Sequence, residues 1–256
     1  MEIIGPILIS TIAGLSTVLG GLTIFLKIKK ENINKFITFC LSFSIAVMIG
    51  ISITDLIPES SKTILETFGI LRGIVICILT FVIGMCLVTF INKKLNKISS
   101  KIDTTTDSGL YKVGILSMLA LMLHNLPEGI ATFMTSYKDI SLGISLGIAI
   151  MLHNIPEGIS IAVPLYYATG SKKEAIKKTF ISGLAEPLGA ILAFIFLSKF
   201  INDVFISIIL IAVAGIMITL SINELLPQAQ KYKENKYINL GLLCGLIVIL
   251  IQFFAF

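Results

Sequence analysis

The residues best suited to chemistry lie in one short pattern that occurs twice. The first copy is HNLPEG, residues 124–129, and the second, 29 positions later, is HNIPEG, residues 153–158. The two histidines of the chain each open one copy. Both copies lie within apolar runs, where an ionisable side chain costs about 2.5 to 3.5 kcal/mol to insert into a bilayer and therefore marks a functional site by default.

The spacing within each copy favours a metal site. On a helix, the His and the Glu are four residues apart and share a face, with the Asn on an adjoining face. Two such helices side by side would bring two imidazoles, two carboxylates and two amides into one small volume, a ligand set that suits zinc, iron, manganese or cobalt. The candidate ligands are His124, Asn125, Glu128, His153, Asn154 and Glu157.

Each copy also places a proline directly before its Glu. Pro127 and Pro156 remove an amide donor and would free the carbonyls of Leu123 and Leu152, four residues upstream. Carbonyls freed at membrane depth are tolerated where a neighbour, water or an ion takes them up, and broken helices mark ion sites in transporters. The alternative is that these polar residues only join helices by hydrogen bonds. Duplication of a motif that holds every histidine favours the ion.

The composition is that of an integral membrane protein. Apolar residues make up 55% of the chain, charged residues 14%, and the mean hydropathy is +0.98. The net charge of +5 comes from lysines in short loops without interleaved aromatic residues, which indicates membrane topology and phospholipid rather than a nucleic-acid partner. The four cysteines lie in apolar runs without a CxxC pair, which predicts free thiols.

Eight apolar runs are each long enough to span a bilayer. They cover residues 3–26, 36–57, 70–91, 111–135, 140–166, 175–198, 203–226 and 237–256. The predicted fold is therefore an all-α membrane protein of eight transmembrane helices, one domain over 1–256, with a polar cytoplasmic linker at about 92–110. Sixteen of the 20 basic residues follow spans 1, 3, 5 and 7, which predicts that those loops are cytoplasmic and that both termini are outside.

Two further patterns involve acidic residues beside prolines. Asp55-Leu56-Ile57-Pro58 after span 2 matches Glu224-Leu225-Leu226-Pro227 after span 7, which suggests that spans 1–3 and 6–8 form an inverted repeat around spans 4 and 5. The alternative is that both acids merely end helices near the membrane surface. Glu186-Pro187 predicts a helix interruption within span 6, although its carboxyl group could instead be protonated and hydrogen-bonded to a neighbouring helix.

HNLPEG and HNIPEG on the fourth and fifth spans, GLAEPLGA on the sixth and NELLP on the seventh resemble the ZIP (Zrt/Irt-like) family of divalent metal transporters, most closely its bacterial ZupT-type members. The resemblance covers nearly the whole chain. It implies an eight-helix bundle that takes up zinc, and also iron, manganese, cobalt or cadmium, across the bacterial plasma membrane. It further implies an elevator-like alternation of two helix groups and frequently a homodimer.

By motif position, the resemblance implies that the six motif residues are ligands and that Glu186 completes an adjacent second metal position. Less closely matched places along the transport path are Met48, Asp55, Asn223 and Glu224. Two departures stand out. The loop after span 3 lacks the His-rich segment of many relatives, and Asn154 stands where some relatives have Asp. Three carboxylates then face the four charges of two divalent ions, which favours one bound metal.

Other classes of protein fit less well. An intramembrane zinc protease needs HExxH, whereas Asn follows the His in both copies. A di-iron carboxylate enzyme uses Glu-x-x-His, whereas the order here is His-x-x-x-Glu. A carrier needs polar residues toward both surfaces, and these are available in Asp55, Glu59, Glu186, Asn223 and Glu224. The sequence therefore predicts a carrier with metal as its substrate and without catalytic residues or cofactor, while a metal-selective channel stays open as an alternative.

Overall fold

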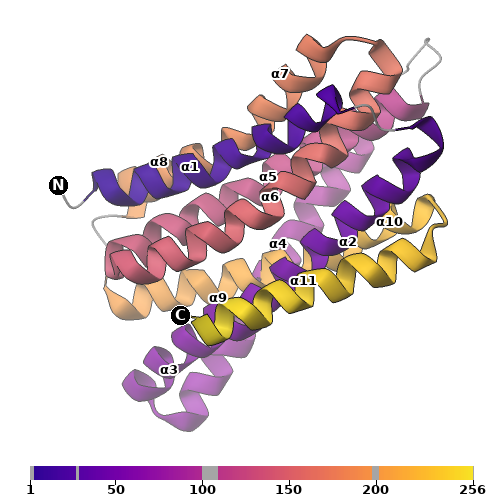
Figure 1. The fold of residues 1–256 in the computed structure, drawn as a ribbon. Helices are drawn as coiled ribbons and strands as arrows, with labels where there is room; N and C mark the ends of the chain where they lie inside the picture. The colour runs from indigo at the N-terminus through magenta and orange to yellow at the C-terminus, as the bar shows by residue number, and fades with distance from the viewer. Residues whose placement is uncertain (1–2, 27–28, 100–108, 198–201, 256) are drawn as a thin grey trace.

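The computed structural model describes residues 3–26, 29–99, 109–197 and 202–255, and these form a bundle of helices with no strand among them (Figure 1). The α-helices are α1 (Ile4–Gly21), α2 (Ile33–Ile51), α3 (Ile57–Phe68), α4 (Ile70–Ser99), α5 (Gly109–Lys138), α6 (Ile140–Thr169), α7 (Lys172–Gly183), α8 (Ala185–Leu192), α9 (Asp203–Leu220), α10 (Leu226–Lys231) and α11 (Asn235–Ala255).

The helices have the lengths that a multi-pass membrane protein needs. Within the described residues, seven helical stretches are long and apolar enough to cross a membrane. The 30-residue helix α5 runs alongside α6 in Figure 1 and corresponds to the fourth predicted span, which brings the total to the eight expected. The two chain ends lie toward the same end of the bundle (Figure 1). The predicted all-α membrane fold is confirmed.

The bundle consists of two groups of helices. The motif group contains α1, α5, α6, α7 and α8, and the frame group contains α2, α3, α4, α9, α10 and α11 (Figure 1). The most extensive packing is internal to each group: α1 and α5 pack on α6, α2 packs on α11, and α4 packs on α9. The groups meet where α6 packs on α2 and α5 packs on α9. The two motif helices therefore form the interface of the motif group with the frame group.

Glycines bring the backbones of α1 and α6 into direct contact. A Cβ atom at Gly20 would fall on the carbonyl oxygen of Ile155, and one at Gly158, the last motif residue, would fall on that of Thr17. The same contacts recur between α8 and α5, where Gly189 meets Leu126 and Gly129 meets Glu186. Small residues permit such close helix packing in membranes. The final glycine of each motif thus holds a motif helix against its neighbour.

The contacts between α2 and α9 carry the signature of the inverted repeat. Ser52 Oγ lies 3.9 Å from Met217 Sδ, and Ser221 Oγ lies 3.8 Å from Met48 Sδ. Because the lower-numbered residue of one helix meets the higher-numbered residue of the other, the two helices are antiparallel and related by a pseudo-two-fold axis. The sequence match extends from the acid-Leu-x-Pro signature to MIGISITDLIP (48–58) and MITLSINELLP (217–227), and each copy contains a π-helical turn.

Three boundaries differ from the sequence-based expectation. Span 2 continues through α3 to Phe68 because the π-helical turn at 52–56 precedes Pro58, which then lies in the first turn of α3, where the missing N–H costs no helical bond. Helix α4 extends to Ser99, so the first part of the predicted linker is helical, while 100–108 lie outside the described residues. Helices α5 and α6 stay helical through their motif prolines, and the predicted interruption near Glu186 occurs at Leu184, between α7 and α8.

Candidate metal site

Helices α5 and α6 place the two motifs in the interior of the bundle. The side chains of Asn125, Glu128, His153, Asn154, Glu157 and Glu186 are all fully buried. The backbone of His124 belongs to α5, but its side chain lies outside the part of the chain that the structure describes. Six of the seven predicted ligands therefore occupy the core, where a charged group needs a partner.

A histidine from one motif meets the glutamate of the other. His153 Nε2 lies 3.1 Å from Glu128 Oε1, within hydrogen-bonding distance, and both side chains are 0% exposed. Helix α2 supports this pair, since Ser44 Oγ donates to the backbone oxygen of His153 at 3.1 Å. The pair joins α5 to α6 through an imidazole nitrogen and a carboxylate oxygen, two groups that ligate zinc.

The two motif asparagines orient their amide groups alike. Asn154 Nδ2 donates to the carbonyl oxygen of Ala13 at 2.9 Å and also to Glu186 Oε1. Asn125 Nδ2 donates to the carbonyl oxygen of Ser182 at 3.4 Å. Ala13 and Ser182 are 169 positions apart, as Met48 and Met217 of the inverted repeat are, so the two amides make matching contacts. Each asparagine donates from its NH₂ group to a carbonyl oxygen of a neighbouring helix. Its own Oδ1 atom has no hydrogen-bond partner among the described atoms.

Several oxygen and nitrogen atoms of this region that could bind a metal have no hydrogen-bond partner among the described atoms. They are Asn125 Oδ1, His153 Nδ1, Asn154 Oδ1 and Glu186 Oε2. Buried polar atoms are normally satisfied, and each exception needs an explanation such as an ion. Amide oxygen, carboxylate oxygen and imidazole nitrogen are together a mixed donor set for a divalent transition metal.

Three buried carboxylates interact here. Glu128 and Glu157 both act electrostatically on Glu186. Burying like charges together is unfavourable unless protons or a cation neutralise them. Among the described side chains, however, no three His, Cys, Asp or Glu residues are grouped as they would be around a metal ion. The structure instead brings the donors together in pairs, His153 with Glu128 and Asn154 with Glu186.

The predicted path residues lie along α2 and α9. Met48 is buried against Ser221, and Asp55 is half-buried with Thr54 Oγ1 2.9 Å from its Oδ2. Asn223 is exposed and Glu224 is half-buried in the equivalent π-helical turn, Ser221–Leu225, which follows α9. Sequence reasoning missed Met217, the repeat partner of Met48, although the longer match of 48–58 with 217–227 was the available signal.

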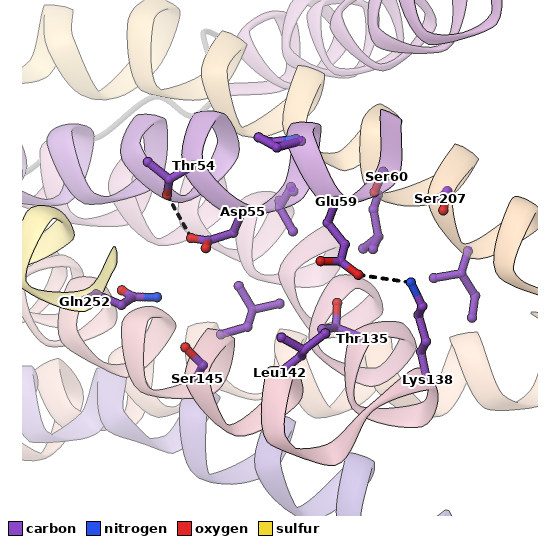
Figure 2. A pocket seen from close by; sticks show the side chains of 15 residues that line it. Thr54, Asp55, Glu59, Ser60, Thr135, Lys138, Leu142, Ser145, Ser207 and Gln252 are labelled. Atoms are coloured by element: carbon purple, nitrogen blue, oxygen red, sulfur yellow. Dashed lines mark hydrogen bonds and ion pairs between the residues drawn. The ribbon is translucent and has the colours of Figure 1, made fainter. Parts of the chain in front are cut away.

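Asp55 also lines a cavity of about 190 Å³ between the two groups (Figure 2). Glu59 from α3 and Lys138 from α5 approach each other across it, with 3.1 Å between Oε1 and Nζ. Sequence reasoning did not anticipate this pair, because no spacing along the chain connects Lys138 with Glu59.

The fold and the buried donors define a multi-pass membrane protein with a polar centre between two repeated helices. The family model described as ZIP Zinc transporter matches residues 99–252. The chain is 40% identical to the zinc transporter ZupT of Oceanobacillus iheyensis over 96% of this chain and 95% of that protein. It is 37% identical to the ZupT of Clostridium perfringens (97% and 95%) and 39% identical to that of Lysinibacillus sphaericus (94% and 93%). The chain belongs to the ZIP family, a family of transporters rather than enzymes.

Proposed function

We propose that this protein takes up divalent transition-metal cations, zinc first, across the bacterial plasma membrane into the cytoplasm. The observation that carries the proposal is the buried pair of His153 and Glu128 between α5 and α6, with Asn154 and Glu186 beside it. Relatives that match nearly the whole chain are named zinc transporters. The proposed ligands are His124, Asn125, Glu128, His153, Asn154, Glu157 and Glu186.

The donor set accepts more than one metal. Imidazole with carboxylate and amide oxygens suits zinc, iron, manganese and cobalt, and affinity at equilibrium follows the Irving–Williams order, so zinc outbinds manganese and ferrous iron. Cadmium is expected as a further substrate. The three carboxylates would leave one positive charge of two divalent ions unbalanced in the buried site, so we propose one bound metal at a time.

The proposed mechanism is alternating access by motion of one helix group against the other. The backbone contacts made through glycine in the motif group lie within that group, which favours its movement as a unit. Its boundary with the frame group consists of α6 on α2 and α5 on α9. Asp55 lies toward one mouth of this boundary, and Asn223 and Glu224 lie on the repeat-related turn toward the other. Met48 lies between them on α2.

The proposed topology follows from the lysines, with both termini outside the cell. The apolar residues of α4 and α11 face outward from the bundle, since only 11% and 22% of their apolar windows are buried. Lipid is the proposed partner of these faces, and a second copy of the chain would cover part of them in a homodimer.

The test is the entry of radiolabelled zinc into liposomes that contain the purified protein. With a carrier, zinc entry saturates as the zinc concentration rises. Entry is also faster when unlabelled zinc is present inside the liposomes, because the carrier then binds zinc for its return to the outer side. A channel gives no such counter-transport. Entry of labelled zinc equal to that into liposomes without the protein would reject the proposed function.

A further inference from the structure

The cavity that contains Asp55 opens at the end of the bundle where the chain ends lie. Its lining combines both helix groups, with Glu59 from α3 of the frame group facing Thr135 and Lys138 from α5 of the motif group (Figure 2). Gln252 of α11 closes one side. In the proposed topology this is the outer mouth of the boundary along which the groups would slide.

Two carboxylates reach this cavity from one helix face. Asp55 and Glu59 are four residues apart and direct their carboxylates into the same space (Figure 2). The counter-charge is Lys138 Nζ, which contacts Glu59 Oε1 at 3.1 Å, with side chains 26% and 50% exposed for Lys138 and Glu59. Two negative charges and one positive charge leave the cavity with a net negative charge.

Neutral polar residues complete the lining. Ser60 Oγ, Thr135 Oγ1 and Gln252 Oε1 are buried and have no hydrogen-bond partner among the described atoms, and the Ser60 residue is only 1% exposed. Buried oxygens without partners are costly, so their collection around one cavity calls for a ligand. Carboxylate, hydroxyl and amide oxygens are what a hard divalent cation prefers.

We propose that this cavity is an outer capture site for divalent cations and that Lys138 is a tethered ammonium that a metal displaces from Glu59. The proposal rests on the proposed function, since it describes where the carrier first holds its substrate. Exposed ion pairs are weak, so displacing Lys138 costs little, and a doubly charged ion interacts more strongly with the two carboxylates than a single ammonium does. Lys138 thus competes with the metal for one carboxylate.

The first test is the concentration dependence of zinc uptake in liposomes. Lys138→Gln lowers the KM about threefold with kcat unchanged, and Glu59→Gln raises the KM by a similar or larger factor, the range expected for an exposed ion pair. The double variant behaves like Glu59→Gln alone, because the lysine then has nothing to compete for. Lys62→Gln and Glu66→Gln are matched controls, since both residues are exposed on α3 and neither lines the cavity.

The kinetic outcomes separate the alternatives. A lower kcat with unchanged KM in Lys138→Gln would make the ion pair a latch between the helix groups and overturn the capture site. Unchanged KM values in both variants, with active wild-type protein, would make it a surface ion pair, overturn the capture site and leave the proposed function intact.

A second measurement does not depend on transport. Mn²⁺ binding, followed by electron paramagnetic resonance, is measured on purified protein carrying Glu128→Ala and Glu157→Ala, which removes two ligands of the proposed central site. We expect one weak Mn²⁺ site to remain in this variant. Adding Glu59→Gln should abolish binding at that site, and adding Lys138→Gln should raise its affinity for Mn²⁺. Absence of that site, or its indifference to Glu59→Gln, overturns the capture site even if zinc uptake by the wild type also fails.

Discussion

His153 on α6 and Glu128 on α5 face each other with 3.1 Å between Nε2 and Oε1, in a part of the bundle from which solvent is excluded. We propose that these two atoms are the donors that a zinc ion takes from these side chains. A metal that took both atoms would replace this bond, which occupies Nε2 of the imidazole and Oε1 of the carboxylate when no metal is bound. Opening of the pair is the local event that the proposed transport cycle requires.

Removing either motif glutamate removes a proposed ligand of the transported ion. Glu128→Ala and Glu157→Ala should each lower zinc uptake by about a hundredfold or more, since loss of even a supporting partner of a metal ligand costs about 10- to 100-fold. Uptake per protein in liposomes measures this, with membrane abundance followed in parallel. Lys93→Gln in the exposed end of α4 is the control and should transport normally. Normal uptake by either alanine variant would remove that residue from the site.

Acid should slow uptake. The ligating imidazole must be neutral and the carboxylates ionised, so protons compete with the metal for the same groups as the pH falls. We expect slower zinc uptake at a pH near 5 than near 7, measured in liposomes buffered equally on both sides. Equal rates at the two pH values would contradict metal binding by these residues.

The last residue of each motif should be intolerant of any side chain. In Gly158→Ala the new Cβ meets the backbone of Thr17, which cannot move as a side-chain tip can, so α1 and α6 must separate. We expect a loss of about 1 to 3 kcal/mol, seen as a lower melting temperature in detergent. The matched control is Gly5→Ala, whose nearest neighbour is the flexible end of Ile140 at 3.2 Å. Equal melting temperatures for the two variants would contradict the close contact.

Thr17 and Glu186 occupy equivalent positions of the inverted repeat, since they are 169 positions apart, as Met48 and Met217 are. Thr17 is fully buried, its Oγ1 has no described hydrogen-bond partner, and it approaches α6 as Glu186 approaches α5. We therefore expect Glu186→Thr to lose zinc uptake and the added substitution Thr17→Glu to regain part of it. Uptake by the single and double variants at equal membrane abundance measures this. A double variant as inactive as Glu186→Thr would show that the two positions are not interchangeable.

The sequence predicts which residues belong to the site better than it predicts which of those residues contact each other. Helix periodicity places His153 and Glu157 on one face, but the bond that forms joins His153 to Glu128 of the other copy, because spacing along one helix says nothing about how two helices are rotated against each other. The position of Glu186 near Asn154 likewise depends on the packing of α8 on α5. Hydropathy locates the spans but misses the continuation of α2 into α3.

The pairing of Lys138 with Glu59 is also a tertiary property. The residues are 79 positions apart in the sequence and belong to different helix groups, so charge patterning does not indicate that they pair. By contrast, the antiparallel contact of Met48 with Ser221 could be anticipated from the repeated segment, because a repeat that crosses the membrane in opposite directions must pair in this way.

The most direct test of the central claim is a crystal structure of the zinc-soaked protein with anomalous scattering measured at the zinc edge. The account predicts a peak between α5 and α6, about 2.0 to 2.2 Å from His153 Nε2 and from the carboxylate oxygens of Glu128 and Glu157, with the bond from His153 to Glu128 opened. Zinc peaks confined to the surface, with His153 and Glu128 still bonded to each other, would contradict it.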